Sequence, residues 1–122
     1  MKTGIILFAH GSRDPLWHVP IQAVQRRLQA QDMALDVRCA YLELTEPDLP
    51  ECVRRMIDAG VSRIRILPMF LGMGRHARED LPQLIAQVRQ SHPQIGVEVL
   101  PALGEDPRLA DLSCQIALDN LN

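Results

Sequence analysis

Four short apolar runs alternate with four amphipathic segments, and this alternation constrains the fold more than any other feature of the chain. The apolar runs cover residues 4–9, 35–44, 63–71 and 96–100. They are too short for buried helices and are typical of strands covered on both faces. Each is followed by a segment with apolar residues three or four positions apart, which predicts a helix. We therefore expect an α/β fold, a three-layer sandwich with a four-stranded parallel sheet and helices on both faces.

Proline, glycine and capping residues predict where two of the helices begin and end. Asp14-Pro15 offers an N-cap followed by a first-turn proline, so the first helix is expected to begin there, with a kink or restart at Pro20. The second helix is expected to begin at Thr45 and to end at Gly60, a residue suited to the position after a helix C-terminus.

Composition excludes several classes of protein. The 122 residues are 47% hydrophobic and 23% charged, which predicts one soluble domain over residues 1–122. A net charge of −2 and 3% aromatic residues argue against a nucleic-acid partner. The apolar run near the N-terminus is shorter than a signal sequence core or a membrane span, so we expect a cytoplasmic protein with no membrane partner. The three cysteines form no CxxC pair, which argues against a zinc knuckle, an iron–sulfur site or a disulfide framework.

Three reactive residues stand at equivalent places in successive strand–helix units. His10 follows the first apolar run, Glu43 closes the second and His76 follows the third, and the three are separated by equal steps of 33 residues. Because ligands of parallel sheets bind beyond the carboxyl ends of the strands, all three are expected at one edge. Two imidazoles and a carboxylate suit an open three-ligand site for a first-row divalent metal. They are our predicted catalytic and metal-binding residues.

Other interpretations of these residues remain. A histidine at a strand end often has only a structural hydrogen bond, and Glu43 would serve equally well as a cap of the second helix. Phosphate transfer at His10 is a further option, although Ala9 stands where histidine phosphatases carry arginine. Residues 72–77 fit G-x-G-x-x-A, but they follow the third strand rather than the first, which disfavours a dinucleotide site. The remaining histidines, His18 and His92, are predicted to be surface residues.

Four stretches together resemble the short class II sirohydrochlorin chelatases, which insert cobalt or iron in cobalamin and sirohaem synthesis. The stretches are "HGSRDP" (10–15), "LELTEP" (42–47), "LPMFLGMGRHAREDLP" (67–82) and "PALGEDPRL" (101–109). They follow in order across nearly the whole chain. The resemblance implies that His10 and His76 are the metal and catalytic residues, that Glu43 is the acidic residue between them, and that the sandwich is chelatase-like.

The resemblance also implies an activity and a partner. The protein is expected to insert Co²⁺, with Fe²⁺ as the second choice, into sirohydrochlorin, releasing two protons and using no ATP. The metal, for which Ni²⁺ is also chemically suitable, would be a substrate, and no cofactor would be permanently bound. One unit in place of two implies a homodimer. A non-catalytic carrier of metal or tetrapyrrole, using the same crevice, is the alternative. The residues predicted to bind the carboxylates of the substrate are Ser12, Arg13, Arg75 and Arg78.

Overall fold

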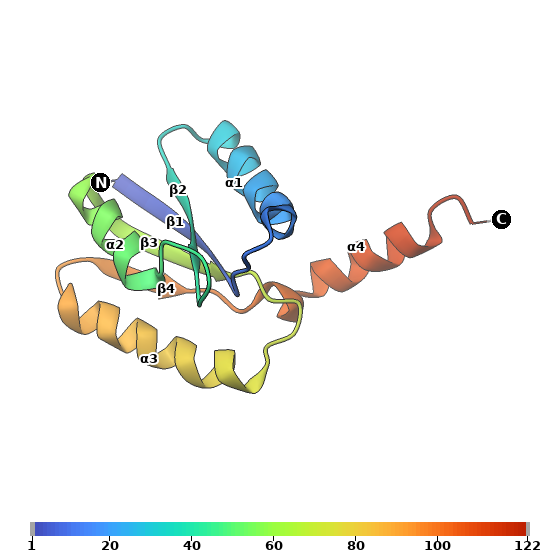
Figure 1. Cartoon of the computed structure of the whole chain (residues 1–122). Coiled ribbons are helices and arrows are strands. Elements are labelled where there is room, and N and C mark those ends of the chain that lie inside the picture. Colours follow the sequence, from blue (N-terminus) through green and yellow to red (C-terminus); the bar gives the residue numbers. More distant parts are fainter. Residues whose placement is uncertain (1, 122) are drawn as a thin grey trace.

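The computed structural model describes residues 2–121, in which helices cover a parallel sheet (Figure 1). The strands are β1 (Lys2–Ala9), β2 (Asp36–Tyr41), β3 (Val61–Pro68) and β4 (Gly96–Val99). The helices are α1 (Val19–Gln31), α2 (Leu49–Asp58), α3 (Arg75–Ser91) and α4 (Pro107–Leu118), with short 3-10 helices η1 (Pro15–His18) and η2 (Leu103–Glu105). All strand pairs are parallel, in the order β2-β1-β3-β4. The predicted four-stranded parallel sheet is confirmed.

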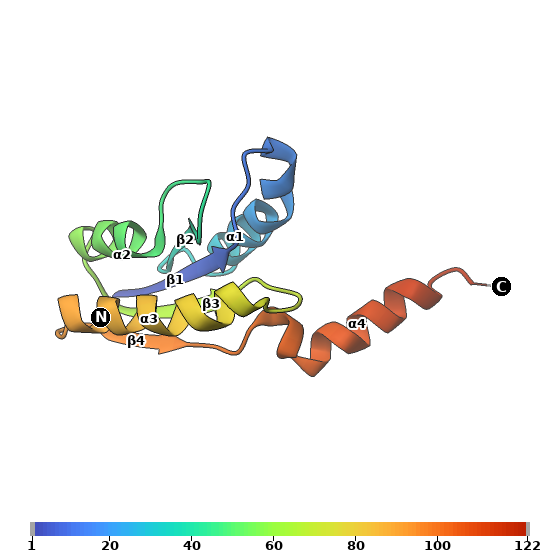
Figure 2. The ribbon, with the colours of Figure 1, turned by 60° about the horizontal axis from the view of Figure 1, so that its bottom comes forward.

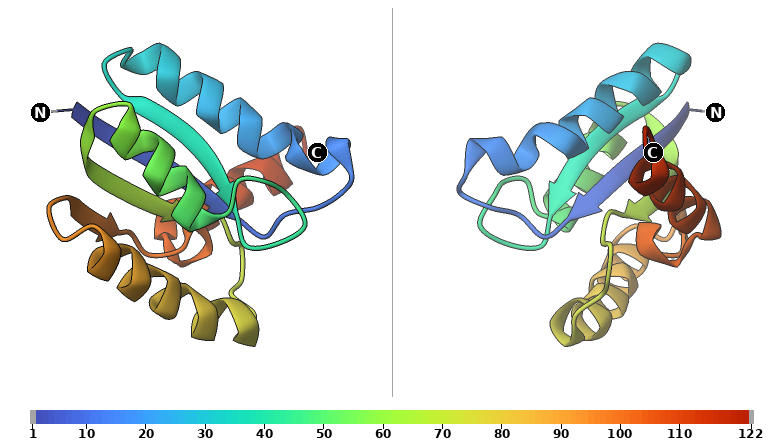
Figure 3. Two further views of the ribbon diagram at one scale, coloured as in Figure 1. Left: turned by 60° about the vertical axis from the view of Figure 1, so that its left-hand side comes forward. Right: turned by 90° about the vertical axis from the view of Figure 1, so that its right-hand side faces the viewer.

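Two separate apolar cores lie on the two faces of this sheet. On one face, Ile21, Val24 and Leu28 of α1 pack against β1 and β2. On the opposite face, α2 and α3 pack side by side over a core to which all four strands contribute (Figure 3). Chain order explains this distribution. The crossover from β1 to β2 runs one way across the sheet, and those from β2 to β3 and from β3 to β4 run the other way, so right-handed connections place α1 on one face and α2 and α3 on the other. The predicted helix layers on both faces are confirmed.

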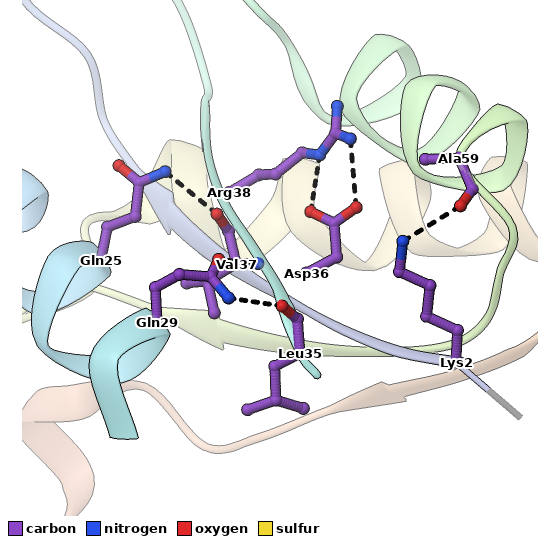
Figure 4. Close-up of polar contacts among 8 residues, drawn as sticks. All are labelled: Lys2, Gln25, Gln29, Leu35, Asp36, Val37, Arg38 and Ala59. Atoms are coloured by element: carbon purple, nitrogen blue, oxygen red, sulfur yellow. Dashed lines mark hydrogen bonds and ion pairs between the residues drawn. The ribbon is translucent and has the colours of Figure 1, made fainter. Parts of the chain in front are cut away.

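Side chains from the helices occupy both free edges of the sheet. At β2, Gln25 Nε2 donates to the Val37 carbonyl at 3.0 Å and Gln29 Nε2 donates to the Leu35 carbonyl (Figure 4). At β4, the guanidinium of Arg89 in α3 donates to the Val97 carbonyl at 2.8 Å. Unpaired backbone groups at a sheet edge invite another strand, so these side chains disfavour growth of the sheet at either edge.

Predicted element boundaries near the carboxyl edge of the sheet differ in part from the structure. Strand β2 ends at Tyr41, not at residue 44, because the following segment turns away and Leu44 has a positive φ of 65°. Helix α2 begins at Leu49 instead of Thr45, since the Asp48 carboxylate accepts the Glu51 N–H and caps the helix there. The predicted restart at Pro20 is confirmed, because η1 ends at His18 and α1 begins at Val19; Pro20 lies in the first turn of α1, where its missing N–H costs no hydrogen bond.

The last helix departs most from the regular pattern. Helix α4 follows β4 but does not return to the sheet; it projects beyond the carboxyl ends of the strands (Figure 2). None of its residues is buried. Within residues 2–121, no helix is long and apolar enough to cross a membrane.

Candidate active site

A histidine–carboxylate pair stands at the carboxyl edge of the sheet. His10 directly follows β1, the strand beside which the strand order reverses, where ligands of such sheets bind. Its Nε2 lies 2.9 Å from Oε1 of Glu43, in the loop after β2. The two side chains are 51% and 56% exposed, so an external ligand can reach both. A carboxylate accepts hydrogen bonds, so the neutral tautomer of His10 that suits this contact has its proton on Nε2 and a free lone pair on Nδ1.

Backbone hydrogen bonds between the two loops hold this pair together. Beyond the end of the sheet, Leu42 N donates to the Ala9 carbonyl at 2.9 Å and Glu43 N donates to the His10 carbonyl at 3.0 Å. Between them the loops approach so closely that a Cβ on Gly11 would lie 1.8 Å from the Glu43 carbonyl oxygen. Gly11 also has a φ of 104°, which L-residues with a side chain rarely adopt. Glycine at this position therefore allows the His10–Glu43 contact to form.

Thr45 and His18, which the sequence did not point to as site residues, hold the loop after β1 in place by hydrogen bonds to the backbone of Ser12. Thr45 Oγ1 accepts the Ser12 N–H at 3.1 Å and donates to the Ser12 carbonyl at 2.8 Å. His18 Nε2 donates to the same carbonyl at 2.8 Å. Like His10 and Glu43, Ser12 and Thr45 are 33 residues apart, so the spacing that pointed to one pair also contained the other.

The prediction that His18 lies on the surface is wrong. Its side chain is buried, with its ring edge-on to the rings of Trp17 and Tyr41 at centroid distances of 5.1 and 5.2 Å. A short 3-10 turn, which helical periodicity does not describe, directs it inward. Burial raises the pKa of Tyr41 to about 12, so this phenol stays neutral.

Burial keeps the thiols of Cys39 and Cys52 protonated. Burial raises the pKa of Cys39, and it raises the pKa of Cys52 to about 12, so both remain thiols at neutral pH. A metal binds the thiolate form. Among the residues described at this edge, imidazole and carboxylate are therefore the candidate metal ligands.

The predicted substrate-binding residues fall into two groups. Arg13 is exposed on the first loop, two residues beyond Gly11, and Arg75 and Arg78 are exposed in the first turn of α3. The Arg75 guanidinium donates to Glu79 at 3.0 Å. Ser12 is partly buried, and its hydroxyl accepts the Asp14 N–H, so the structure gives it a part in shaping the loop. Substrate binding by these four residues remains a prediction.

His76 is the one predicted ligand that the structure does not bring into contact with the pair. It is exposed as the second residue of α3. In the part of the chain that the structure describes, no three side chains of His, Cys, Asp or Glu are grouped to hold a metal ion. The carboxyl edge therefore presents a two-residue site, with His76 on the neighbouring loop–helix junction.

Comparison with known proteins identifies the family. The CbiX family model matches residues 4–119. The chain belongs to the CbiX family. A sirohydrochlorin cobaltochelatase of Methanococcus maripaludis is 30% identical over 66% of this chain and 56% of its own length. A sirohydrochlorin ferrochelatase of Priestia megaterium is 28% identical over 88% of this chain and 41% of its own length. The chain thus spans less than two thirds of the length of these curated relatives.

Solved structures share the CbiX-family fold. A CbiX protein from Marinobacter aquaeolei VT8, assigned to cobalamin (vitamin B12) biosynthesis, superimposes with a TM-score of 0.84 at 30% identity, over 98% of this chain and 97% of its own. The sirohydrochlorin chelatase SirB from Bacillus subtilis subspecies spizizenii, in complex with cobalt, gives a TM-score of 0.81 at 25% identity. That match covers 98% of this chain and 51% of SirB. The predicted family resemblance is confirmed.

Proposed function

We propose that this protein inserts a divalent metal, Co²⁺ in the first place and Fe²⁺ in the second, into sirohydrochlorin without ATP. The observation that carries the proposal is the exposed His10–Glu43 pair at the ligand-binding edge of a CbiX-family sheet. The relatives named above support this choice of substrate, since they are sirohydrochlorin cobaltochelatases and ferrochelatases.

Metal insertion needs a group that binds the ion weakly and accepts protons. As the metal enters the macrocycle, its bonds to the ring nitrogens replace two pyrrole N–H bonds, so two protons leave. The free Nδ1 of His10 can hold the ion during delivery or take one of these protons, but not both at once. Glu43 fixes the ring through Nε2–H and stabilises the imidazolium once it forms. Half-exposed ligands favour release of the metal to the macrocycle over permanent binding.

The macrocycle is proposed to lie across the edge between the first loop and α3. Its peripheral carboxylates would pair with the guanidinium groups of Arg13, Arg75 and Arg78, for which a forked donor is well suited. His76, in the same turn of α3 as two of these arginines, would then reach the macrocycle from the side opposite His10. In this arrangement His76 would act as second metal ligand or as proton acceptor only when the substrate is bound.

The active form is proposed to be a cytoplasmic homodimer. This chain covers 51% of SirB, so two copies supply about the same length of sheet and helix as that relative. Free thiols at Cys39, Cys52 and Cys114 agree with a reducing compartment.

Turnover distinguishes an enzyme from a carrier. Purified protein is incubated anaerobically with excess sirohydrochlorin and Co²⁺, Fe²⁺ or Ni²⁺ in turn, and the visible spectrum of the metallated product is followed. We expect many equivalents of product per protein chain, above the rate without protein, and none above that rate with His10→Ala. One equivalent of product or less per protein chain would show that the protein is a carrier and not an enzyme. Equal rates for wild type and His10→Ala would remove the proposed site.

A further inference from the structure

Leu44 has a strained backbone in the loop that carries Glu43. Its φ is 65°, and the Thr45 N–H donates to the Glu43 carbonyl at 2.8 Å, which closes a γ-turn with Leu44 at its centre. A γ-turn with a positive φ at its centre is the rarer and more strained of the two forms. Glycine adopts this conformation without strain, whereas the Cβ of a leucine makes it unfavourable.

Packing within the chain does not offset this strain. The Leu44 side chain is 55% exposed, and it belongs to neither of the apolar cores that residues 2–121 form. An exposed leucine alone needs no explanation, because much of any protein surface is apolar. An exposed leucine in a conformation that favours glycine does need one, since strained residues cluster where a ligand is bound. We therefore looked for a contact that Leu44 makes outside its own chain.

Hydrogen bonds on both sides of Leu44 hold it beside the candidate site. Glu43, the residue before it, contacts the imidazole of His10. Thr45, the residue after it, is hydrogen-bonded to the backbone of Ser12. Both loops extend beyond the carboxyl ends of the strands (Figure 3). Leu44 is thus fixed at the edge that carries the His10–Glu43 pair.

The surroundings of Leu44 favour the flat face of a tetrapyrrole as the occupant. A molecule that rests on Leu44 also covers the neighbouring His10–Glu43 pair. A permanent protein partner there would block access to these two half-exposed side chains, whereas a substrate has to reach them. Arg13, exposed on the first loop, adds positive charge to the same edge. A metal-free tetrapyrrole with an apolar face and peripheral carboxylates is complementary to both features.

We infer that Leu44 is a substrate-contact residue, which packs against one face of the macrocycle and holds the ring at a fixed height over His10. This inference rests on the proposed function and specifies how its substrate is seated. The γ-turn fixes the loop before the substrate arrives, so little conformational freedom is lost on binding. A fixed height matters because the imidazole must meet the ring nitrogens to deliver a metal or accept a proton.

Binding of metal-free sirohydrochlorin tests this contact separately from turnover. Leu44→Gly removes the side chain and the backbone strain together, and Leu44→Met keeps an apolar side chain of similar volume. Met33→Gly is the matched control: Met33 is 86% exposed and lies between α1 and β2, at the opposite end of the sheet. Binding is followed by quenching of the fluorescence of Trp17, the one tryptophan of the chain. Sedimentation equilibrium gives the mass, and urea unfolding gives the stability.

The contact predicts a loss of affinity without a loss of stability. Leu44→Gly should bind sirohydrochlorin about tenfold more weakly than wild type, the effect of losing one partly buried leucine side chain. The loss should be equal at low and high salt, because an apolar contact is not screened. The urea midpoint of Leu44→Gly should equal or exceed that of wild type, since the strain is relieved. Leu44→Met and Met33→Gly should bind as wild type does.

Several outcomes would overturn the inference and leave the proposed function standing. These are wild-type affinity in Leu44→Gly, an equal loss of affinity in Met33→Gly, or a urea midpoint of Leu44→Gly well below that of wild type, which would mean that Leu44 packs within its own chain. A lower mass of Leu44→Gly would assign the side chain to a contact with a second copy and would also overturn it. A wild type that neither binds nor metallates sirohydrochlorin would refute the proposed function itself.

Discussion

Replacing Gly11 with alanine tests how the structure holds His10 against Glu43. The added Cβ meets two obstacles, a φ of 104° and a carbonyl oxygen 1.8 Å away. To relieve the clash the loops must separate, which breaks two backbone N–H hydrogen bonds between them, Glu43 N to the His10 carbonyl and Ser12 N to Thr45 Oγ1. Gly60 provides the control: its φ is 92°, but a Cβ there meets no atom within 4 Å.

Gly11→Ala and Gly60→Ala both place a side chain at a positive φ, but only in Gly11→Ala does the new Cβ clash with backbone atoms. A residue with a side chain in the left-handed region costs about 1–2 kcal/mol, which applies to both variants. The lower entropy of the unfolded chain with alanine offsets part of this cost equally in both. Losing two hydrogen bonds adds about 1 kcal/mol each at Gly11 alone. We therefore expect Gly11→Ala to lower the free energy of unfolding by about 2 kcal/mol more than Gly60→Ala.

Urea unfolding and metal insertion measure the two consequences. A difference of about 2 kcal/mol corresponds to a urea midpoint about 1 M lower for Gly11→Ala than for Gly60→Ala. Under conditions where both variants are folded, Gly11→Ala should lose most of the insertion activity and Gly60→Ala should keep it. Equal stability of the two variants, or full activity of folded Gly11→Ala, would refute the argument that close approach of the loops sets the site.

Three further substitutions separate the roles of neighbouring residues. Glu43→Gln should lower the rate of insertion about 10–100-fold, since the charge that stabilises the His10 imidazolium is lost; an unchanged rate in steady-state kinetics would leave Glu43 as a loop residue. Thr45→Val removes the hydroxyl bonded to both Ser12 backbone groups and should lower activity and stability, whereas Thr45→Ser should restore both; a serine variant as impaired as the valine variant would contradict this role. Asp48→Ala removes the cap of α2 and should cost about 1 kcal/mol of stability, measured by urea unfolding, with insertion unchanged; a lower rate in the folded variant would place Asp48 in the site.

The sequence alone was sufficient for the architecture and for the pairing at its edge. A buried strand is a short continuous apolar run, whereas a helix has apolar residues three or four positions apart. The order of strands and helices therefore followed from the spacing of apolar residues in the sequence. Parallel units of nearly equal length bring residues one unit apart to the same edge. The step of 33 residues therefore identified His10 and Glu43, which the structure places 2.9 Å apart.

Tertiary structure decided what periodicity leaves open. The spacing of the apolar residues in α4 shows that one side of the helix needs cover, but spacing does not specify which surface supplies it, and this chain does not cover it with its own sheet. The burial of His18 and the role of Thr45 depend on hydrogen bonds between loops distant in sequence. His76 shares the step of 33 residues but stands apart from the pair. It lies beyond a loop and at the start of a helix, and spacing alone does not determine the path of that segment.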